Sequence, residues 1–198
     1  KDIADSSEIR RVLRKRGAEK FGWSRRQKPG SGKGSIKKGL GVAQSTWPKF
    51  IDMDSTVEIK AFKDGAIELR AGVQDIGTGT KTILAQVVAE ELGLKTEDIK
   101  IRIGDTLFPD GPGSGGSQVT GSITPAARNA AYQLKLKVFD LAARKLETGT
   151  AELAAEDGSI FSKNDPSKKI AFRDALQLMQ TGQITINTSR SEEYGGAA

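Results

Sequence analysis

The chain has 198 residues, enough for one substantial hydrophobic core or two small ones. It contains no cysteine and no histidine, which excludes disulfides, thiolate or Ser-His-Asp nucleophiles, and zinc sites built from those side chains. No apolar run approaches the roughly 20 residues that cross a bilayer. No tight carboxylate cluster suggests a metal ion held directly by the chain, although an organic cofactor could still carry one.

The net charge of +6 is concentrated near the N-terminus. Residues 1–38 carry 13 Lys or Arg and 4 acidic residues, whereas the remaining chain carries 18 basic and 21 acidic residues. We predict a helix from Asp5 to Phe21, with Asp5 and Glu8 as a capping box and a thin apolar stripe. Residues 24–35 have the composition of a linker. The sequence therefore predicts a basic helix and linker over residues 1–37 and a folded domain over residues 38–198.

The basic segment allows two interpretations. It could bind nucleic acid, or it could be a solvated helix and linker that wrap on a partner surface. We favour the second, because aromatic residues and glycines are not interleaved with the charges as in RNA-reading segments.

The folded domain begins with patterns typical of strands. Residues 39–47 predict a first strand, and Val57–Ala61 alternates apolar and charged residues as a second strand does. Asp64 and Gly65 predict a two-residue hairpin turn, followed by a returning strand over residues 66–73.

A glycine-punctuated turn follows that strand. Residues 77–80 read Gly-Thr-Gly-Thr, and an amphipathic helix with Gly93 as its stop comes after them. Such a loop lets backbone amides approach a ligand closely, and the helix directs its positive end to the same point. The stretch predicts a place for a phosphate or another polar acceptor. Similar turns also begin helices that bind nothing, and this stretch alone leaves both interpretations open.

The same pattern then repeats. A strand over residues 98–103 leads into a second glycine loop, residues 104–121, and Thr124-Pro125 predicts the start of a long helix that ends near Glu147. If the two helices lie side by side on one sheet, both loops leave from the same edge and form one site. A long loop of small residues inside a compact domain usually has a function.

The C-terminal part shows no chemistry. We predict a hairpin around Asp157-Gly158, a short helix over residues 172–179, a last strand that contains Ile184 and Ile186, and a polar end over residues 189–198 that frays. The predicted fold is α+β, in two layers, with a mixed sheet and helices packed on one of its faces.

Several motifs, taken together and in order, resemble those of a known family. The stretches are Asp75–Thr80, Ala85–Gly93, Ile103–Thr106, Gly111–Ser117 and Thr124–Ala131. They resemble the molybdopterin-binding large subunit of the xanthine dehydrogenase/aldehyde oxidase family, over roughly residues 39–147. The segment Arg16–Trp23 is similar to the one that joins the two halves of such subunits.

The resemblance implies a cofactor and a set of residues that hold it. The cofactor is molybdopterin with molybdenum, in bacteria often as the cytosine dinucleotide form, and the metal's sulfur ligands come from the pterin. The implied cofactor-binding residues lie in the two glycine loops: Gly77, Thr78, Gly79, Thr80, Gly116, Ser117, Gln118, Val119 and Thr120. At Thr78 many members of the family carry Gln, so a backbone contact is expected there in place of a side-chain contact.

The resemblance also implies an activity. Members of the family are oxidoreductases that hydroxylate an aldehyde or an N-heteroaromatic carbon with oxygen from water, and a glutamate serves as the general base. No Gly-Glu motif of that kind is visible, and Glu90 and Glu91 read as ordinary surface acids. We therefore assign no catalytic residue and no metal ligand, and expect a cofactor-cradling fragment that is inactive alone.

The implied partners are the rest of the same large subunit, iron–sulfur and FAD subunits and a small-molecule substrate, with no membrane span and no nucleic acid. The cytoplasm is the expected location, with periplasmic export as a second option. Two other functions remain open from the residues: a nucleotide-phosphate binding module of another class, and a nucleic-acid binder that uses the basic segment.

Overall fold

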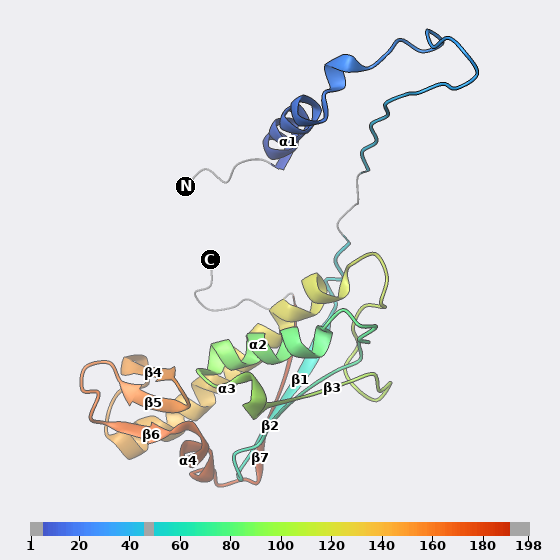
Figure 1. Ribbon diagram of the computed structural model, residues 1–198. Coiled ribbons are helices and arrows are strands. Elements are labelled where there is room, and N and C mark those ends of the chain that lie inside the picture. Colours follow the sequence, from blue (N-terminus) through green and yellow to red (C-terminus); the bar gives the residue numbers. More distant parts are fainter. Residues whose placement is uncertain (1–5, 46–49, 191–198) are drawn as a thin grey trace. The chain divides into compact units, whose positions relative to one another are not determined.

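The computed structural model describes residues 6–45 and 50–190. The chain divides into two compact units, residues 1–47 and residues 48–198 (Figure 1). The functional boundary expected between residues 37 and 38 stays a prediction. No helix among the described residues is long and apolar enough to span a lipid bilayer.

The first unit contains the predicted basic helix. Helix α1 spans Ser6–Phe21 and is followed by a short 3-10 helix, η1, at Trp23–Arg25. The apolar stripe is exposed, with Leu13 at 62% exposure, because residues 6–45 form no hydrophobic core of their own. The strand predicted over residues 39–47 is wrong for residues 39–45, which form no helix or strand, and its last two residues lie outside the described residues. Asp5, half of the predicted capping box, also lies outside them.

The second unit holds the core. Its elements in chain order are β1 (Thr56–Phe62), β2 (Ile67–Ala71), α2 (Thr80–Leu92), η2 (Thr96–Asp98), β3 (Ile99–Ile103), α3 (Val119–Leu146), η3 (Thr150–Glu152), β4 (Leu153–Glu156), β5 (Ser159–Ser162), β6 (Lys169–Ala171), α4 (Phe172–Gln177) and β7 (Gln183–Ser189). A four-stranded sheet has the order β3-β2-β1-β7, and a three-stranded sheet has the order β4-β5-β6. The strand β6 was not predicted.

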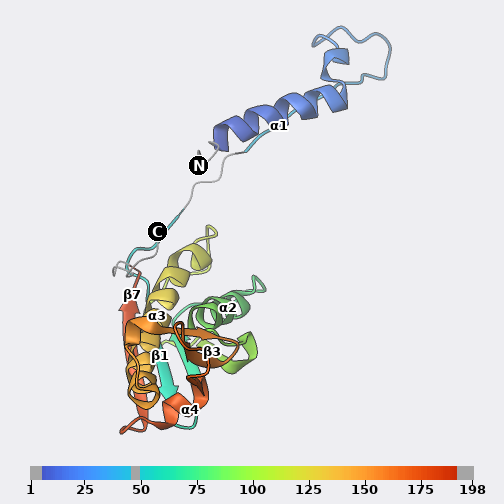
Figure 2. The same ribbon diagram turned by 90° about the vertical axis from the view of Figure 1, so that its left-hand side faces the viewer.

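The four-stranded sheet is mixed and is covered by helices on one face. Strand β1 pairs antiparallel with β2 and β7, and β2 pairs parallel with β3. Helices α2 and α3 pack against each other and against this sheet (Figures 1 and 2). Alternate residues of β1, such as Val57 and Ile59, are completely buried beneath the helices, as their period-2 pattern predicts. The predicted α+β architecture is confirmed.

Helix α3 begins earlier than the Thr124-Pro125 signal predicts. It starts at Val119, so Pro125 lies inside its second turn. A proline there has no N–H to donate to the carbonyl of Gly121. Arg190 donates to that carbonyl through Nη1 at 2.6 Å, so the lost helix bond is replaced by a contact from the end of β7. Sequence alone could not reveal this replacement, because Arg190 is distant in the chain.

Two turns can be compared with their predictions. The β1–β2 turn has three residues, because the Phe62 amide pairs with the Ala66 carbonyl at 2.9 Å and Gly65 takes the positive φ of 96°. The predicted two-residue turn is therefore wrong by one residue. The hairpin of β4 and β5 has the predicted two-residue turn, with positive φ at both Asp157 and Gly158.

The sheet face away from the helices carries a buried carboxylate. Glu68 of β2 is only 5% exposed and accepts hydrogen bonds from Arg70 Nε at 2.5 Å and Arg102 Nε at 2.6 Å. Burial by itself raises the pKa of Glu68, but the hydrogen bonds and charges of Arg102 and Arg70 outweigh it and hold the pKa below the usual 4.5. Because Arg70 and Arg102 are paired directly across β2 and β3, the carboxylate separates two like charges.

Replacing Glu68 by glutamine is expected to lower the free energy of unfolding by about 2 kcal/mol, since two guanidinium groups lose their shared partner. A depressed carboxylate pKa stabilises the fold above the pKa of the unfolded chain, and this stability is lost as the pH falls through the lower pKa of the folded chain. The variant should therefore lose less stability than the parent as the pH falls below about 4.5. Urea denaturation across this range measures both effects. If the stability of the parent and of the variant depended on pH in the same way, Glu68 would not have the assigned role in stabilising the fold.

Glu91 is not the ordinary surface acid that the sequence suggests. Its side chain is only 8% exposed, and it forms ion pairs with Lys135 and with Arg128, at 3.3 Å from Arg128 Nε. Both partners belong to α3, so the carboxylate ties α2 to α3. Glu91 therefore has a structural role that periodicity within one helix could not disclose.

Candidate functional site

The two glycine loops converge at one edge of the sheet. Strands β2 and β3 are parallel, so the chain leaves both of them at the same edge. The first loop follows β2 and leads into α2, and the second follows β3 and leads into α3. Figure 1 shows both loops at the same end of the second unit, beside the start of each helix. The convergence expected from the repeated pattern is thus present.

Direct contacts hold the loops together. The amide of Gly72 donates to the Pro109 carbonyl at 2.7 Å, and Gly72 forms a parallel bridge with Asp110. Further out, Ser114 donates its amide and its hydroxyl to Gln74 Oε1 at 3.2 and 3.0 Å. These bonds fix the second loop against the chain that enters the first.

A pocket of about 470 Å³ lies between the loops. Its lining consists of Ile76, Thr78, Ser114, Gly115, Gly116, Ser117, Gln118, Val119 and Thr120. None of these side chains is charged. Any attraction for an anion must therefore come from backbone amides, hydroxyl groups and the start of α3.

The amides of the first loop are hydrogen-bonded within the chain. Asp75 Oδ1 accepts from Gly77 at 3.0 Å and Gly79 at 3.1 Å, and Oδ2 accepts from Lys81 at 3.1 Å. The hydrogen bond from the Lys81 amide is the largest of the effects that hold the pKa of Asp75 below the usual 3.8; burial opposes it, and the amides of Gly79, Gly77 and Thr78 add to it. The Asp75 carboxylate therefore occupies the start of α2, and the anion site expected there stays a prediction.

The second loop keeps its helix terminus open. The first amide bonded within α3 is that of Ser122, which donates to the Gln118 carbonyl at 3.0 Å. The amides of residues 119–121 precede this ladder and, within residues 6–45 and 50–190, meet no acceptor. Ser117 and Thr120, which both carry hydroxyl groups, also line the pocket. This donor set fits an anionic group such as a phosphate.

The structure brings most of the proposed cofactor residues together. Thr78 lines the pocket with all five residues of the second-loop set, residues 116–120. Gly77, Gly79 and Thr80 are not part of the lining. Thr80 is 2% exposed, and its hydroxyl lies 3.2 Å from that of Thr78. Thr80 therefore supports the first loop from its buried side.

Sequence reasoning missed several residues of the site. Ile76, Ser114 and Gly115 also line the pocket, and the 70% exposure of Ile76 makes it an apolar side chain at a loop tip. Phe50 lies against the second loop, because a Cβ added to Gly116 would be 2.7 Å from Phe50 Cδ2. A lone isoleucine among polar loop residues was a usable signal, whereas nothing in the sequence connects Phe50 with Gly116.

In the part of the chain that the structure describes, no group of three or more His, Cys, Asp and Glu side chains could hold a metal ion.

Comparison with known proteins identifies the family. Residues 16–196 match the model of the molybdopterin cofactor-binding domain. The chain is 30% identical over 189 residues to a xanthine dehydrogenase molybdenum-binding subunit of Escherichia coli O157:H7. The aligned region covers 91% of this chain and 24% of that subunit. It is 35% identical over 121 residues to PaoC, an aldehyde oxidoreductase molybdenum-binding subunit of Escherichia coli K12, covering 60% of this chain and 16% of that subunit.

Solved structures agree with the sequence comparison. The CO dehydrogenase from Oligotropha carboxidovorans superposes with a TM-score of 0.63 at 27% identity, over 69% of this chain and 18% of that chain. The chain thus spans about a quarter or less of the length of these relatives. The paired strand–loop–helix units, the order of their motifs and the family match agree, and the chain belongs to the molybdopterin cofactor-binding domain family of the molybdenum hydroxylases.

Proposed function

We propose that this chain is the part of a molybdenum hydroxylase large subunit that holds the phosphate-bearing end of a molybdopterin cofactor. The observation that carries the proposal is the uncharged pocket between the two loops, whose lining includes Val119 and Thr120 at the start of α3, where no acceptor among the described residues meets the first amides. Such a helix start binds anions without a cationic side chain. The rest of the same subunit would supply the other walls of the site.

In this proposal the chain's residues bind and orient the cofactor. The amides of residues 119–121 and the hydroxyls of Ser117 and Thr120 receive phosphate oxygens, and the backbone of Thr78 contacts the rest of the cofactor. The small side chains of Gly115 and Gly116 let the ligand approach the backbone. The bound cofactor supplies the molybdenum redox chemistry that hydroxylates an aldehyde or N-heteroaromatic carbon. The general base of that reaction is expected outside these 198 residues, so the chain alone should show no turnover.

Electrostatic repulsion at Thr120 tests the phosphate site. A Thr120→Glu variant places a carboxylate at the start of α3, where it stabilises the helix but repels an anion. Binding of cytidine diphosphate to the 198-residue chain, measured by calorimetry, should weaken about tenfold. Thr120→Gln has about the size of the glutamate variant without its charge, and should show only the smaller loss in affinity caused by removing the Thr120 hydroxyl. If both variants lost the same affinity for cytidine diphosphate, the size of the new side chain and not its charge would be the cause.

Asp75 separates the two loops in the same assay. Since its carboxylate already occupies the α2 terminus, phosphate is proposed to lie on the second loop only. Asp75→Asn should therefore leave cytidine diphosphate binding within about twofold of the parent. A large loss would move the phosphate site to the first loop.

The nucleotide form of the cofactor and its partners extend the proposal. We infer the cytosine dinucleotide form, which requires cytidine diphosphate to bind more tightly than adenosine or guanosine diphosphate. Equal affinities would favour the second candidate, a nucleotide-phosphate module of another class. Iron–sulfur and FAD subunits would carry the electrons away, in the cytoplasm or, after export, in the periplasm. The third candidate, a nucleic-acid binder, would use the largely exposed basic residues of the first unit. It predicts that the affinity for nucleic acid falls steeply with salt concentration and that binding is lost when residues 1–38 are deleted.

A further inference from the structure

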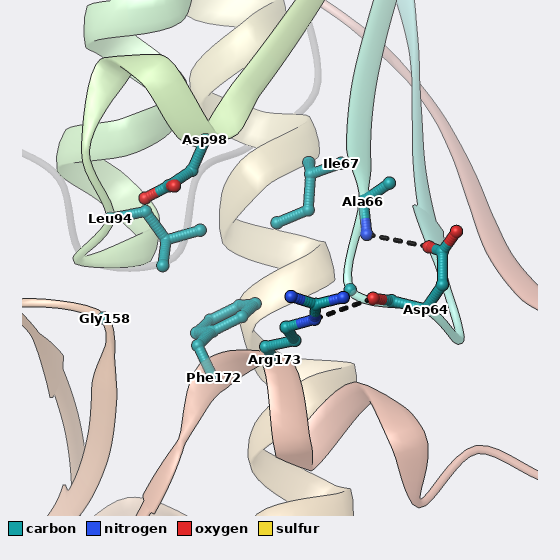
Figure 3. Close-up of a pocket in the computed structure, with 9 residues that line it drawn as sticks. Asp64, Ala66, Ile67, Leu94, Asp98, Gly158, Phe172 and Arg173 are labelled. Atoms are coloured by element: carbon teal, nitrogen blue, oxygen red, sulfur yellow. Dashed lines mark hydrogen bonds between the residues drawn. The ribbon is translucent and has the colours of Figure 1, made fainter.

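A second pocket, also of about 470 Å³, lies near the other end of the sheet and shares no residue with the glycine-loop pocket. It is formed where the β1–β2 turn, the connection from α2 to β3, and the start of α4 come together (Figure 3). Its lining consists of Asp64, Gly65, Ala66, Ile67, Leu94, Asp98, Gly158, Phe172 and Arg173. Charged groups lie at its rim and apolar side chains lie between them.

One side of the rim is a fixed guanidinium. Arg173 Nε donates to the Asp64 carbonyl at 2.9 Å, and the arginine stem lies on Gly65, where an added Cβ would be 2.3 Å from Arg173 Cγ. Its two terminal nitrogens have no partner among the described residues, and Figure 3 shows the guanidinium facing the pocket. The Arg173 side chain is thus held in place with its carboxylate-binding edge open.

The opposite side of the rim is a carboxylate. Asp98 Oδ2 accepts from the Lys95 amide at 3.1 Å, which holds the side chain, and Oδ1 has no partner in the described ranges. Asp98 and Arg173 lie on opposite sides in Figure 3 and form no ion pair within the described chain. The third charged group, Asp64, accepts from the Ala66 amide at 3.0 Å and points away from Asp98.

The floor between these charges is apolar and rigid. Ile67 and Phe172 are each 2% exposed, and Leu94 closes the side beneath Asp98. The Phe172 amide donates to the Gly158 carbonyl at 2.8 Å, which attaches the start of α4 to the β4–β5 turn. Apolar side chains therefore lie between Arg173 and Asp98 in the lining of the pocket.

We propose that this pocket binds a small ω-amino carboxylate, a molecule with a carboxylate and an ammonium group at the two ends of an apolar spacer. The carboxylate meets the terminal nitrogens of Arg173, the ammonium group meets Asp98 Oδ1, and the spacer lies on Ile67, Leu94 and Phe172. Each partner satisfies a charge that the chain leaves open, and the volume suits a small molecule. This site is independent of the cofactor loops.

A homologous series tests the pocket on the 198-residue chain. The probes are 4-aminobutanoate, 6-aminohexanoate and 8-aminooctanoate, with hexanoate and hexylamine as compounds that carry one charge each. Binding is followed by amide chemical shifts, which should move at Gly65 and Gly158. One spacer length should bind best, with a dissociation constant of about a millimolar, and each singly charged compound should bind about tenfold more weakly. The proposal would be overturned if no probe shows saturable binding, or if the amino carboxylates bind no more tightly than hexanoate and hexylamine.

Two pairs of variants assign the charges. Arg173→Gln and Asp98→Asn should each weaken binding of the best probe about tenfold. Lys63→Gln and Glu97→Gln remove the same charges from neighbouring side chains outside the lining and should leave binding unchanged. If a lining variant fails to fold, as its melting curve would reveal, the comparison of probes on the parent chain decides. Equal losses in the lining and control variants would count against the site.

Discussion

Replacing Gly93 by alanine is expected to lower the free energy of unfolding by about 3 kcal/mol. Gly93 ends α2 with a φ of 67°, a conformation that costs any residue with a Cβ. The added carbon would also lie 2.4 Å from the carbonyl carbon and oxygen of Ala155 in β4, both of which are backbone atoms. Because the Gly158 amide donates to the Gly93 carbonyl at 2.8 Å, neither chain can move away without losing a hydrogen bond.

Gly79 provides the matched control for that experiment. It has a φ of 79° at the other end of α2, but an added Cβ there meets nothing within 4 Å. Gly79→Ala should therefore show only the backbone cost, about 1 kcal/mol. Urea denaturation of both variants separates backbone strain from the clash with β4. If the two losses are equal, close contact between α2 and the three-stranded sheet does not contribute to stability.

A valine at Gly116 is expected to weaken cofactor-phosphate binding on the order of a hundredfold while the fold persists. Gly116 has a φ of 64°, which is strongly unfavourable for a β-branched residue. Its Cβ would lie 2.7 Å from Phe50 Cδ2, so the loop or the ring must shift. In a shifted loop the amides of residues 119–121 no longer point to one phosphate. The affinity for the phosphate falls because these donors lose their alignment. The expectation rests on the proposed function and is measured with cytidine diphosphate.

Two further variants show whether the Phe50 ring is the cause. Combining Gly116→Val with Phe50→Ala removes the obstructing ring and should restore part of the affinity, leaving the loss due to backbone strain. Gly104→Val carries a valine at a φ of 83° in the same loop, with open space around it, and should bind nearly as the parent does. Failure of the double variant to recover would mean that strain alone disables the loop.

Much of the fold could be predicted from local patterns. The alternation in β1, the glycine stop after α2 and the type of turn between β4 and β5 depend on a few neighbouring residues, and each agrees with the structure. The errors arise where distant groups decide. Pro125 is tolerated inside α3 since Arg190 binds the carbonyl that it leaves open, and no local signal announces that contact. Residues 39–45 alternate like a strand yet find no neighbouring strand to pair with in the described chain.

The candidate site was partly predictable for the same reason. Repeated strand–loop–helix patterns suggested that two loops would meet, and the parallel pairing of β2 and β3 brings them together. Which loop can receive a ligand was not visible, because it depends on how Asp75 folds back onto its own amides. Phe50 joins the site only through the folding of the chain that precedes β1 against the second loop.

The sequence by itself determined that this protein has paired glycine loops before two helices and no thiol or imidazole chemistry, since these follow from residue type and spacing. Only the tertiary structure decided that the Asp75 carboxylate caps α2, that the amides at the start of α3 meet no acceptor among the described residues, and that Arg173 and Asp98 line one pocket without an ion pair between them. Such facts depend on distances between residues far apart in the chain. Spacing along a sequence constrains those distances weakly, whereas packing of the helices on the sheet sets them.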